Sequence, residues 1–201
     1  MESNWLITND VKEIITCLKT IKRELPYVLE DVNTWKIILM LQHNAVQATM
    51  VRGLRQGNTL NVLTKKSRKA YEEMLESNDN RDMVKLHLLS FKDLYKNICN
   101  PSYLRMPFQR SDITNKVIER LNEFRNEFTH FAVSGWSIHA SIFPEIIRET
   151  NRIIDHFMSN LGYMFLIDEN DRKQILILIH EINEINDEIE KVNFEKYGFF
   201  E

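Results

Sequence analysis

The stretch WKIILMLQHNAVQATMVR, residues 35–52, indicates which class of fold this chain adopts. Apolar side chains occur on nearly every side of a helix built from it, and a helix that is apolar all round is usually central and buried. Asn33 and Thr34 precede the stretch, where polar side chains commonly cap a helix. We therefore expect residues 35–52 to form a central helix against which the rest of the chain packs.

Other segments carry apolar residues three and four positions apart, the spacing of a helix that buries one side. The apolar stripes are Val11, Ile14, Ile15, Leu18 and Ile21; Val84, Leu88, Phe91, Tyr95 and Ile98; Val117, Leu121, Phe124, Phe128 and Phe131; Ile146, Ile147, Ile153, Ile154, Phe157 and Leu161; and Ile175, Leu178, Ile182, Ile185, Ile189 and Val192. Gly53 and Gly57 are expected to open a loop, and a shorter helix to follow from Thr64 to Leu75.

The expected fold class is therefore all-α, a single helical bundle of about five long helices plus one or two short ones over residues 1–201. No segment alternates apolar and polar residues as a half-buried strand does. The chain has only 5 Gly and 4 Pro, which are too few for the many tight turns of an all-β protein. With 201 residues, it is long enough to bury a core without disulfides.

Several classes of protein and site are not expected. The longest apolar run, from Ile37 to Leu41, is far shorter than the roughly 20 residues that span a membrane, so we expect no membrane partner. The start of the chain lacks a basic segment followed by an apolar stretch, and we expect a cytoplasmic protein. Cys17 and Cys99 form no C-x-x-C motif, and glycine-rich phosphate-binding motifs are lacking, so neither a metal nor a cofactor is expected.

The charges of the chain are unevenly distributed. The formal net charge of −3 provides no general reason to expect nucleic-acid binding. Between positions 52 and 71, however, six basic side chains and no acidic ones occur, and they are candidate RNA contacts: Arg52, Arg55, Lys65, Lys66, Arg68 and Lys69. A solvated loop and helix start is the alternative interpretation, because charge runs commonly face water.

The segment LNEFRNEFTHF, residues 121–131, carries the most informative polar residues, Arg125, Asn126 and His130. At about 100° per residue, Asn126 and His130 lie about 40° apart on a helix. Their side is about opposite the apolar stripe of the same helix, and Arg125 lies at the edge between the two. We therefore expect the three side chains to face solvent, a groove or a partner subunit.

This set of residue types can cleave RNA without a metal ion. Histidine moves a proton near neutral pH, while arginine stays charged and its planar fork matches phosphate oxygens. His130 would assist attack of the 2′-hydroxyl on the adjacent phosphate, Arg125 would stabilise the developing charge, and Asn126 would orient the imidazole or the phosphate. The products would carry a 2′,3′-cyclic phosphate and a 5′-hydroxyl. On spacing alone, an exposed surface pair is the commoner outcome.

The same segment resembles the R-x(4–6)-H motif of the HEPN superfamily, including the polar residue directly after the arginine, here Asn126. The resemblance covers the motif helix and, loosely, the helical layout of the rest. It implies a small all-helical domain that forms a homodimer, in which Arg125 and His130 of two subunits meet in a composite ribonuclease site. Because many members are toxins, defence effectors or RNA-processing factors, it also implies a toxin–antitoxin or defence setting with an antitoxin partner.

Three polar residues interrupt the central helix: His43, Asn44 and Gln47. Buried polar groups need hydrogen-bond partners, so satisfied core residues are one interpretation. The other is that the three support the helix of Arg125 and His130 from behind.

Two further functions remain open beside the ribonuclease. A catalytically inactive domain of the same fold would bind RNA, a nucleotide or a protein partner, since a fold does not establish an activity. A purely structural dimer would use Arg125, Asn126 and His130 as polar contacts between its subunits.

Overall fold

The computed structural model describes residues 9–55, 58–77, 85–130, 137–160 and 167–197, without the side chains of Ser77, His130, Phe194, Lys196 and Tyr197. The described residues form seven α-helices: α1 Asp10–Glu24, α2 Thr34–Arg55, α3 Lys65–Ser77, α4 Phe91–Ile98, α5 Asp112–His130, α6 Phe143–Ser159 and α7 Glu169–Tyr197. Three short 3-10 helices, η1 Leu25–Leu29, η2 Thr59–Val62 and η3 Ala140–Ile142, lie between them. The all-α helical bundle predicted from the sequence is confirmed.

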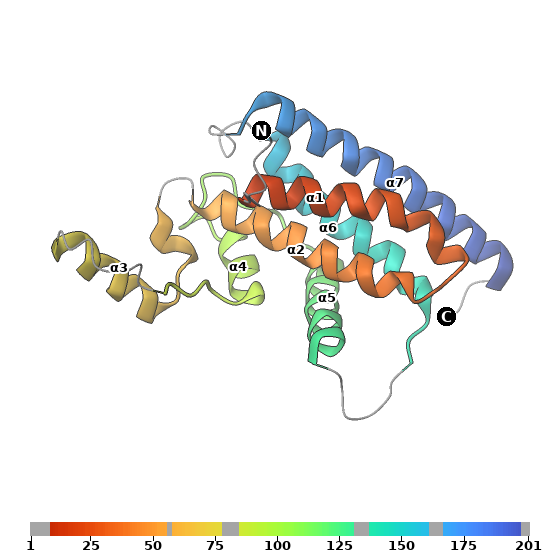
Figure 1. The fold of residues 1–201 in the computed structure, drawn as a ribbon, viewed down its shortest axis with the longest axis horizontal. Helices are drawn as coiled ribbons and strands as arrows, with labels where there is room; N and C mark the ends of the chain where they lie inside the picture. The colour runs from red at the N-terminus through yellow and green to blue at the C-terminus, as the bar shows by residue number, and fades with distance from the viewer. Residues whose placement is uncertain (1–8, 56–57, 78–84, 131–136, 161–166, 198–201) are drawn as a thin grey trace, which may run out of the picture.

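α2 is the central helix, as its sequence predicts. It packs against α1, α4, α5 and α6, and Figure 1 shows it running through the middle of the molecule, with α5 crossing it. Side chains on most sides of α2 are buried, including Trp35, Ile38, Leu39 and Val46. Because each large aliphatic side chain removed from water contributes about 1.5–3 kcal/mol, α2 supplies much of the free energy that holds the bundle together.

Helix ends follow local sequence signals. The Asn9 side chain caps α1 by accepting a hydrogen bond from the backbone N–H of Lys12. Ser90 caps α4 in the same way through the N–H of Asp93. Pro144 stands in the first turn of α6, where the missing N–H of proline has no intrahelical partner to lose.

Two predicted boundaries were wrong. α2 continues through Gly53 to Arg55 instead of ending near Arg52, because Gly53 lies inside the α2–α6 contact, against the ring of Phe157. The stripe that starts at Val84 predicted one helix up to Ile98, but α4 begins only at Phe91. Residues 85–90 are not helical, and Leu88 instead forms an isolated antiparallel bridge with Leu63; Val84 itself lies outside the described residues.

α3 differs from the other helices in its surroundings. It projects from the bundle on the side of α4, and within the described residues it packs along no other helix (Figure 1). None of the helices in the described ranges is both long and apolar enough to cross a membrane.

Candidate active site

Arg125 and Asn126 lie in the second half of α5. The apolar side of this helix, with Val117, Leu121 and Phe124, is buried in the bundle. Asn126 is exposed and Arg125 is partly exposed, as the helical wheel predicts. α5 remains helical as far as His130, so its backbone places His130 one turn after Asn126, although the His130 side chain lies outside the described residues.

The two described side chains of the motif contact each other. Arg125 Nη1 donates a hydrogen bond to Asn126 Oδ1 over 3.2 Å. The Thr129 hydroxyl donates a hydrogen bond to the Arg125 carbonyl oxygen at 2.6 Å, which holds the Thr129 side chain against the last turn of α5. Arg125 makes no ion pair within the described part of the chain, so its guanidinium keeps most of its donors for an anion.

His43 of α2 lies beneath this part of α5. Its side chain is only 3% exposed and stacks on the ring of Phe91 from α4, with 4.0 Å between ring centroids. Burial, followed by the nearby positive charge of Arg125, lowers the pKa of His43 to about 4. The imidazole is therefore neutral at physiological pH.

The hydrogen bonding of His43 is incomplete. Amide side chains of Asn44 and Asn122 lie close enough to favour the charged ring. Neither forms a hydrogen bond of ordinary geometry, and both ring nitrogens of His43 lack a partner among the described residues. The interpretation of His43 as a satisfied core residue therefore finds no support in the described contacts.

The structure thus brings one of the three polar residues of α2, His43, to the motif helix. The positive charge of Arg125 lowers the pKa of His43, and the amide side chain of Asn44 lies close to the His43 ring. Gln47 is half-buried one turn further along α2. Asn122 was not among the site residues predicted from the sequence. It is four residues before Asn126 and therefore on the same side of α5, and this spacing could have identified it as a site residue.

The six candidate RNA contacts do not form one patch. Arg52 and Arg55 end α2, where both lie near Asp10 of α1, at 3.5 and 4.0 Å. They line a groove of about 590 Å³ that also contains Asp168 and Asp171, so a phosphate chain there would meet carboxylates. The other four basic residues lie on α3, outside the bundle, so the RNA-binding role of the six stays a prediction.

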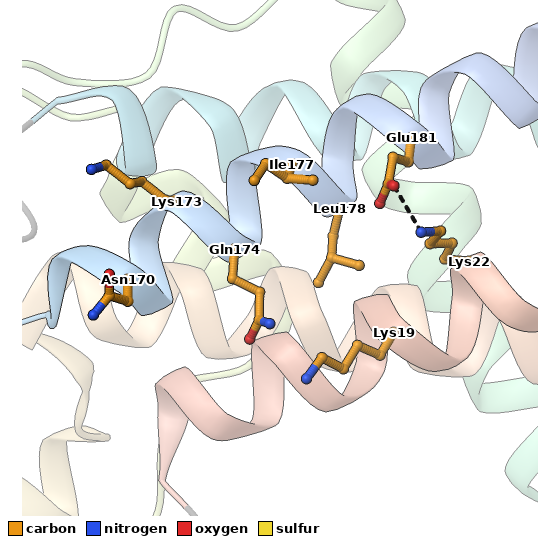
Figure 2. Close-up of a pocket in the computed structure, with 8 residues that line it drawn as sticks. All are labelled: Lys19, Lys22, Asn170, Lys173, Gln174, Ile177, Leu178 and Glu181. Carbon is orange, nitrogen blue, oxygen red and sulfur yellow. Dashed lines mark ion pairs between the residues drawn. The ribbon is translucent and has the colours of Figure 1, made fainter.

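A second groove joins lysines that are far apart in the sequence. Lys19 and Lys22 of α1 and Lys173 of α7 line one groove of about 440 Å³, and Figure 2 shows the Lys173 side chain directed away from the other two. Lys22 is neutralised by Glu181 at 2.8 Å. The sequence shows no local basic run here, because the lysines come together only when α1 packs on α7.

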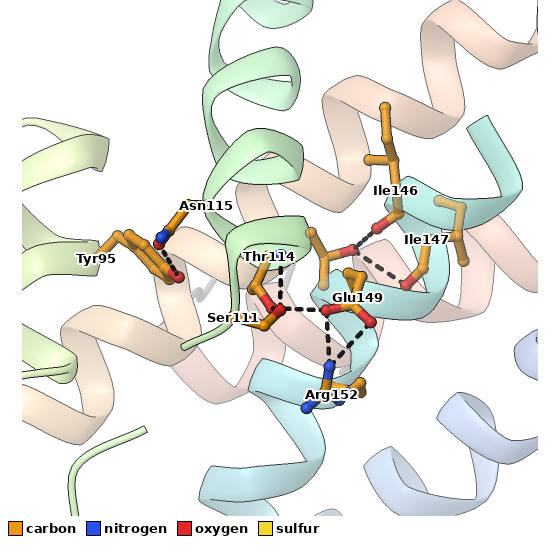
Figure 3. Close-up of polar contacts among 9 residues, drawn as sticks. Tyr95, Ser111, Thr114, Asn115, Ile146, Ile147, Glu149 and Arg152 are labelled. Atoms are coloured by element: carbon orange, nitrogen blue, oxygen red, sulfur yellow. Dashed lines mark hydrogen bonds and ion pairs between the residues drawn. The ribbon is translucent and has the colours of Figure 1, made fainter. Parts of the chain in front are cut away.

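A buried carboxylate lies between the start of α5 and α6. Glu149 of α6 accepts a hydrogen bond from the Thr114 hydroxyl at 2.6 Å and two from Arg152 (Figure 3). Burial acts to raise the pKa of Glu149, but these hydrogen bonds outweigh it and hold the pKa below its ordinary value. The carboxylate is fully engaged in joining the start of α5 to α6, so we assign it a structural role.

Within the described ranges, no three His, Cys, Asp or Glu side chains come together as metal ligands. Comparison of the chain with models of known families, with curated proteins and with solved structures gives no match. The HEPN resemblance accordingly rests on the residues of α5.

Proposed function

We propose that this protein is a metal-independent endoribonuclease of HEPN type, active as a homodimer with a site shared between two subunits. The observation that carries the proposal is the pairing of Arg125 with Asn126 on the open side of α5, one turn before His130. These three residues would form the active site, and a toxin–antitoxin or defence setting would follow from the resemblance.

Charge and burial support this assignment. The guanidinium of Arg125 has no carboxylate partner in the described residues, whereas Arg52, Arg55 and Arg148 each lie beside one. An arginine that is held in place but not neutralised suits a phosphodiester. The neutral His43 beneath it adds no second positive charge to the site, so the charge presented to a phosphate is that of Arg125.

In the proposed reaction, the imidazole of His130 takes the proton of a ribose 2′-hydroxyl, whose oxygen attacks the adjacent phosphorus. The bond between phosphorus and the 5′-oxygen breaks, the protonated imidazole gives its proton to the leaving 5′-oxygen, and the products are a 2′,3′-cyclic phosphate and a 5′-hydroxyl. Arg125 stabilises the charge that develops on the phosphate oxygens. Asn126 accepts from Arg125 and in this way fixes the direction of the guanidinium.

The test is RNA cleavage by the purified protein with and without EDTA, beside Arg125→Ala, Asn126→Ala and His130→Ala. We expect cleavage that survives EDTA and falls by about 10²-fold or more in the Arg125 and His130 variants. Glu127→Gln is the matched control, because Glu127 is an exposed neighbour on α5 at a position where the motif specifies no residue type.

Other outcomes of the same experiment would favour the inactive RNA-binding domain or the structural dimer. RNA binding without cleavage would replace the enzyme with an inactive RNA-binding domain. Loss of the dimer in the variants, with neither binding nor cleavage in the parent, would leave the structural dimer. Activity that persists after dilution to monomers would refute the shared site while leaving the ribonuclease standing.

A further inference from the structure

α3 has few tertiary contacts: Tyr71 packs partly buried against the core, and the backbone N–H of His87 donates a hydrogen bond to the Ser67 hydroxyl at 2.8 Å. The helix is 13 residues long and projects from the bundle (Figure 1). Ser67 is its one buried side chain in the described residues. Isolated helices of this length are marginal in water, because nucleation is unfavourable and few hydrogen bonds follow. Leu75, near its end, is 61% exposed.

The charges of α3 are arranged against its own dipole. We call Lys65, Lys66, Arg68 and Lys69 its basic half, and Glu72, Glu73 and Glu76 its acidic half. The first turn contains no acidic residue and the last turn no basic one. A helix N-terminus carries positive partial charge and the C-terminus negative, so both halves are placed where they destabilise an isolated helix.

We propose that α3 pairs with α3 of a second copy of this chain, antiparallel, around a two-fold axis near Ala70 and Tyr71. Each basic half then lies beside the acidic half of the other copy. In this register, Lys65 lies opposite the partner's Glu76 and Lys69 opposite the partner's Glu72. Each helix N-terminus also gains neighbouring carboxylates, which corrects the unfavourable dipole interaction.

Self-complementarity favours a second copy over an unrelated protein. A two-fold interface places the same patch on both sides, so the patch must match itself. The two charged halves of α3 do so when one helix is reversed.

The same charges disfavour RNA as the partner of α3. A phosphate chain attracted by the basic half would be repelled by the acidic half, which is one turn away. Lys69 already pairs with Glu73 at 3.6 Å, so part of the basic charge is offset within the helix. This pairing does not depend on the proposed ribonuclease, since α3 is a different helix from the one that carries Arg125.

The test uses two variants of the full chain, each with the charge of one half of α3 reversed. The acidic variant replaces the basic half with glutamates (Lys65→Glu, Lys66→Glu, Arg68→Glu and Lys69→Glu), and the basic variant replaces the acidic half with lysines (Glu72→Lys, Glu73→Lys and Glu76→Lys). Light scattering during gel filtration should give each variant half the mass of the parent. A mixture of the two should recover the parent mass, and high salt should weaken both assemblies.

The controls address folding and general attraction between oppositely charged proteins. Circular dichroism of each variant must show the helix content of the parent. A third variant, with Glu184→Lys, Glu188→Lys and Glu195→Lys on the exposed side of α7, gains the same charge as the basic variant but leaves α3 unchanged. It should form no complex with the acidic variant.

Three results would overturn the pairing: equal masses for the parent and both variants, no complex in the mixture, or equal complex formation by the α7 control. If the parent instead bound RNA and the acidic variant lost that binding without any change of mass, α3 would be an RNA contact.

Discussion

The imidazole of His43 stacks on the ring of Phe91, with 4.0 Å between centroids and 23° between the ring planes. This contact joins α2 to α4 directly below the helix that carries Arg125. It holds a titratable ring in the core without a hydrogen-bond partner in the described residues. Because burial lowers the pKa of this ring, the stability of the protein depends on pH.

We expect the free energy of unfolding to fall as the pH drops from about 6.5 to about 4. The unfolded chain takes up a proton at His43 in this window and the folded protein does not, so stability decreases by up to about 3 kcal/mol. Urea unfolding across this range would measure the loss, and His43→Leu should remove this part of it. His87→Leu, at an exposed histidine, is the control. Equal acid sensitivity in the parent and His43→Leu would contradict the prediction.

Arg125→Ala should raise the pKa of His43, because the positive charge of Arg125 contributes to its low value. Arg125→Lys, which keeps the charge, should leave most of the effect in place. NMR titration of the His43 ring protons would measure both. This readout does not require an active enzyme, and an unchanged pKa in Arg125→Ala would show that the two groups are not coupled.

Gly53→Ala should destabilise the protein by about 1–3 kcal/mol, although alanine is the better helix former by about 1 kcal/mol. A Cβ at position 53 would lie 2.7 Å from Cδ1 of the Phe157 ring, which is fully buried and cannot move aside. Thermal unfolding would measure the change. Phe157→Leu alone should be destabilising, but in that background Gly53→Ala should cost less. A stabilised Gly53→Ala protein would mean that helix propensity outweighs the contact.

Thr114→Val should cost about 1–3 kcal/mol at neutral pH, because it removes a hydrogen bond to the buried carboxylate of Glu149 at similar side-chain volume. Thr114→Ser keeps the hydroxyl and should cost less. The stability that Glu149 contributes is present above its ordinary pKa and is lost as the pH falls through its lowered value. The difference between Thr114→Val and the parent should therefore shrink in acid, and a constant difference would argue against the ionised hydrogen bond.

Arg125→Lys should reduce RNA cleavage by about 10²-fold with little change in thermal stability. Lysine keeps the charge but loses the planar fork that binds two phosphate oxygens. Arg125 is partly exposed, and its described hydrogen bonds are local ones within α5, so folding does not depend on it. Full activity in this variant would show that a point charge is sufficient.

Local pattern was enough to predict much of the fold. The burial of α2 follows from apolar residues on nearly all its sides. Such features depend on residues close together in the chain. The C-terminal end of α2 and the start of α4 were predicted wrongly, because Gly53 packs against Phe157 and Leu88 pairs with Leu63, which are distant in the sequence.

For the candidate site too, some features follow from the sequence alone and others only from the tertiary structure. The sequence by itself determined that Arg125 and Asn126 share the open part of α5, because helical geometry relates neighbours on one helix. Only the tertiary structure decided that His43 lies within the field of Arg125, and that Arg52 and the basic half of α3 lie apart. Residues on different helices meet only through packing, since the direction in which α5 crosses α2 is set by the side chains buried between them.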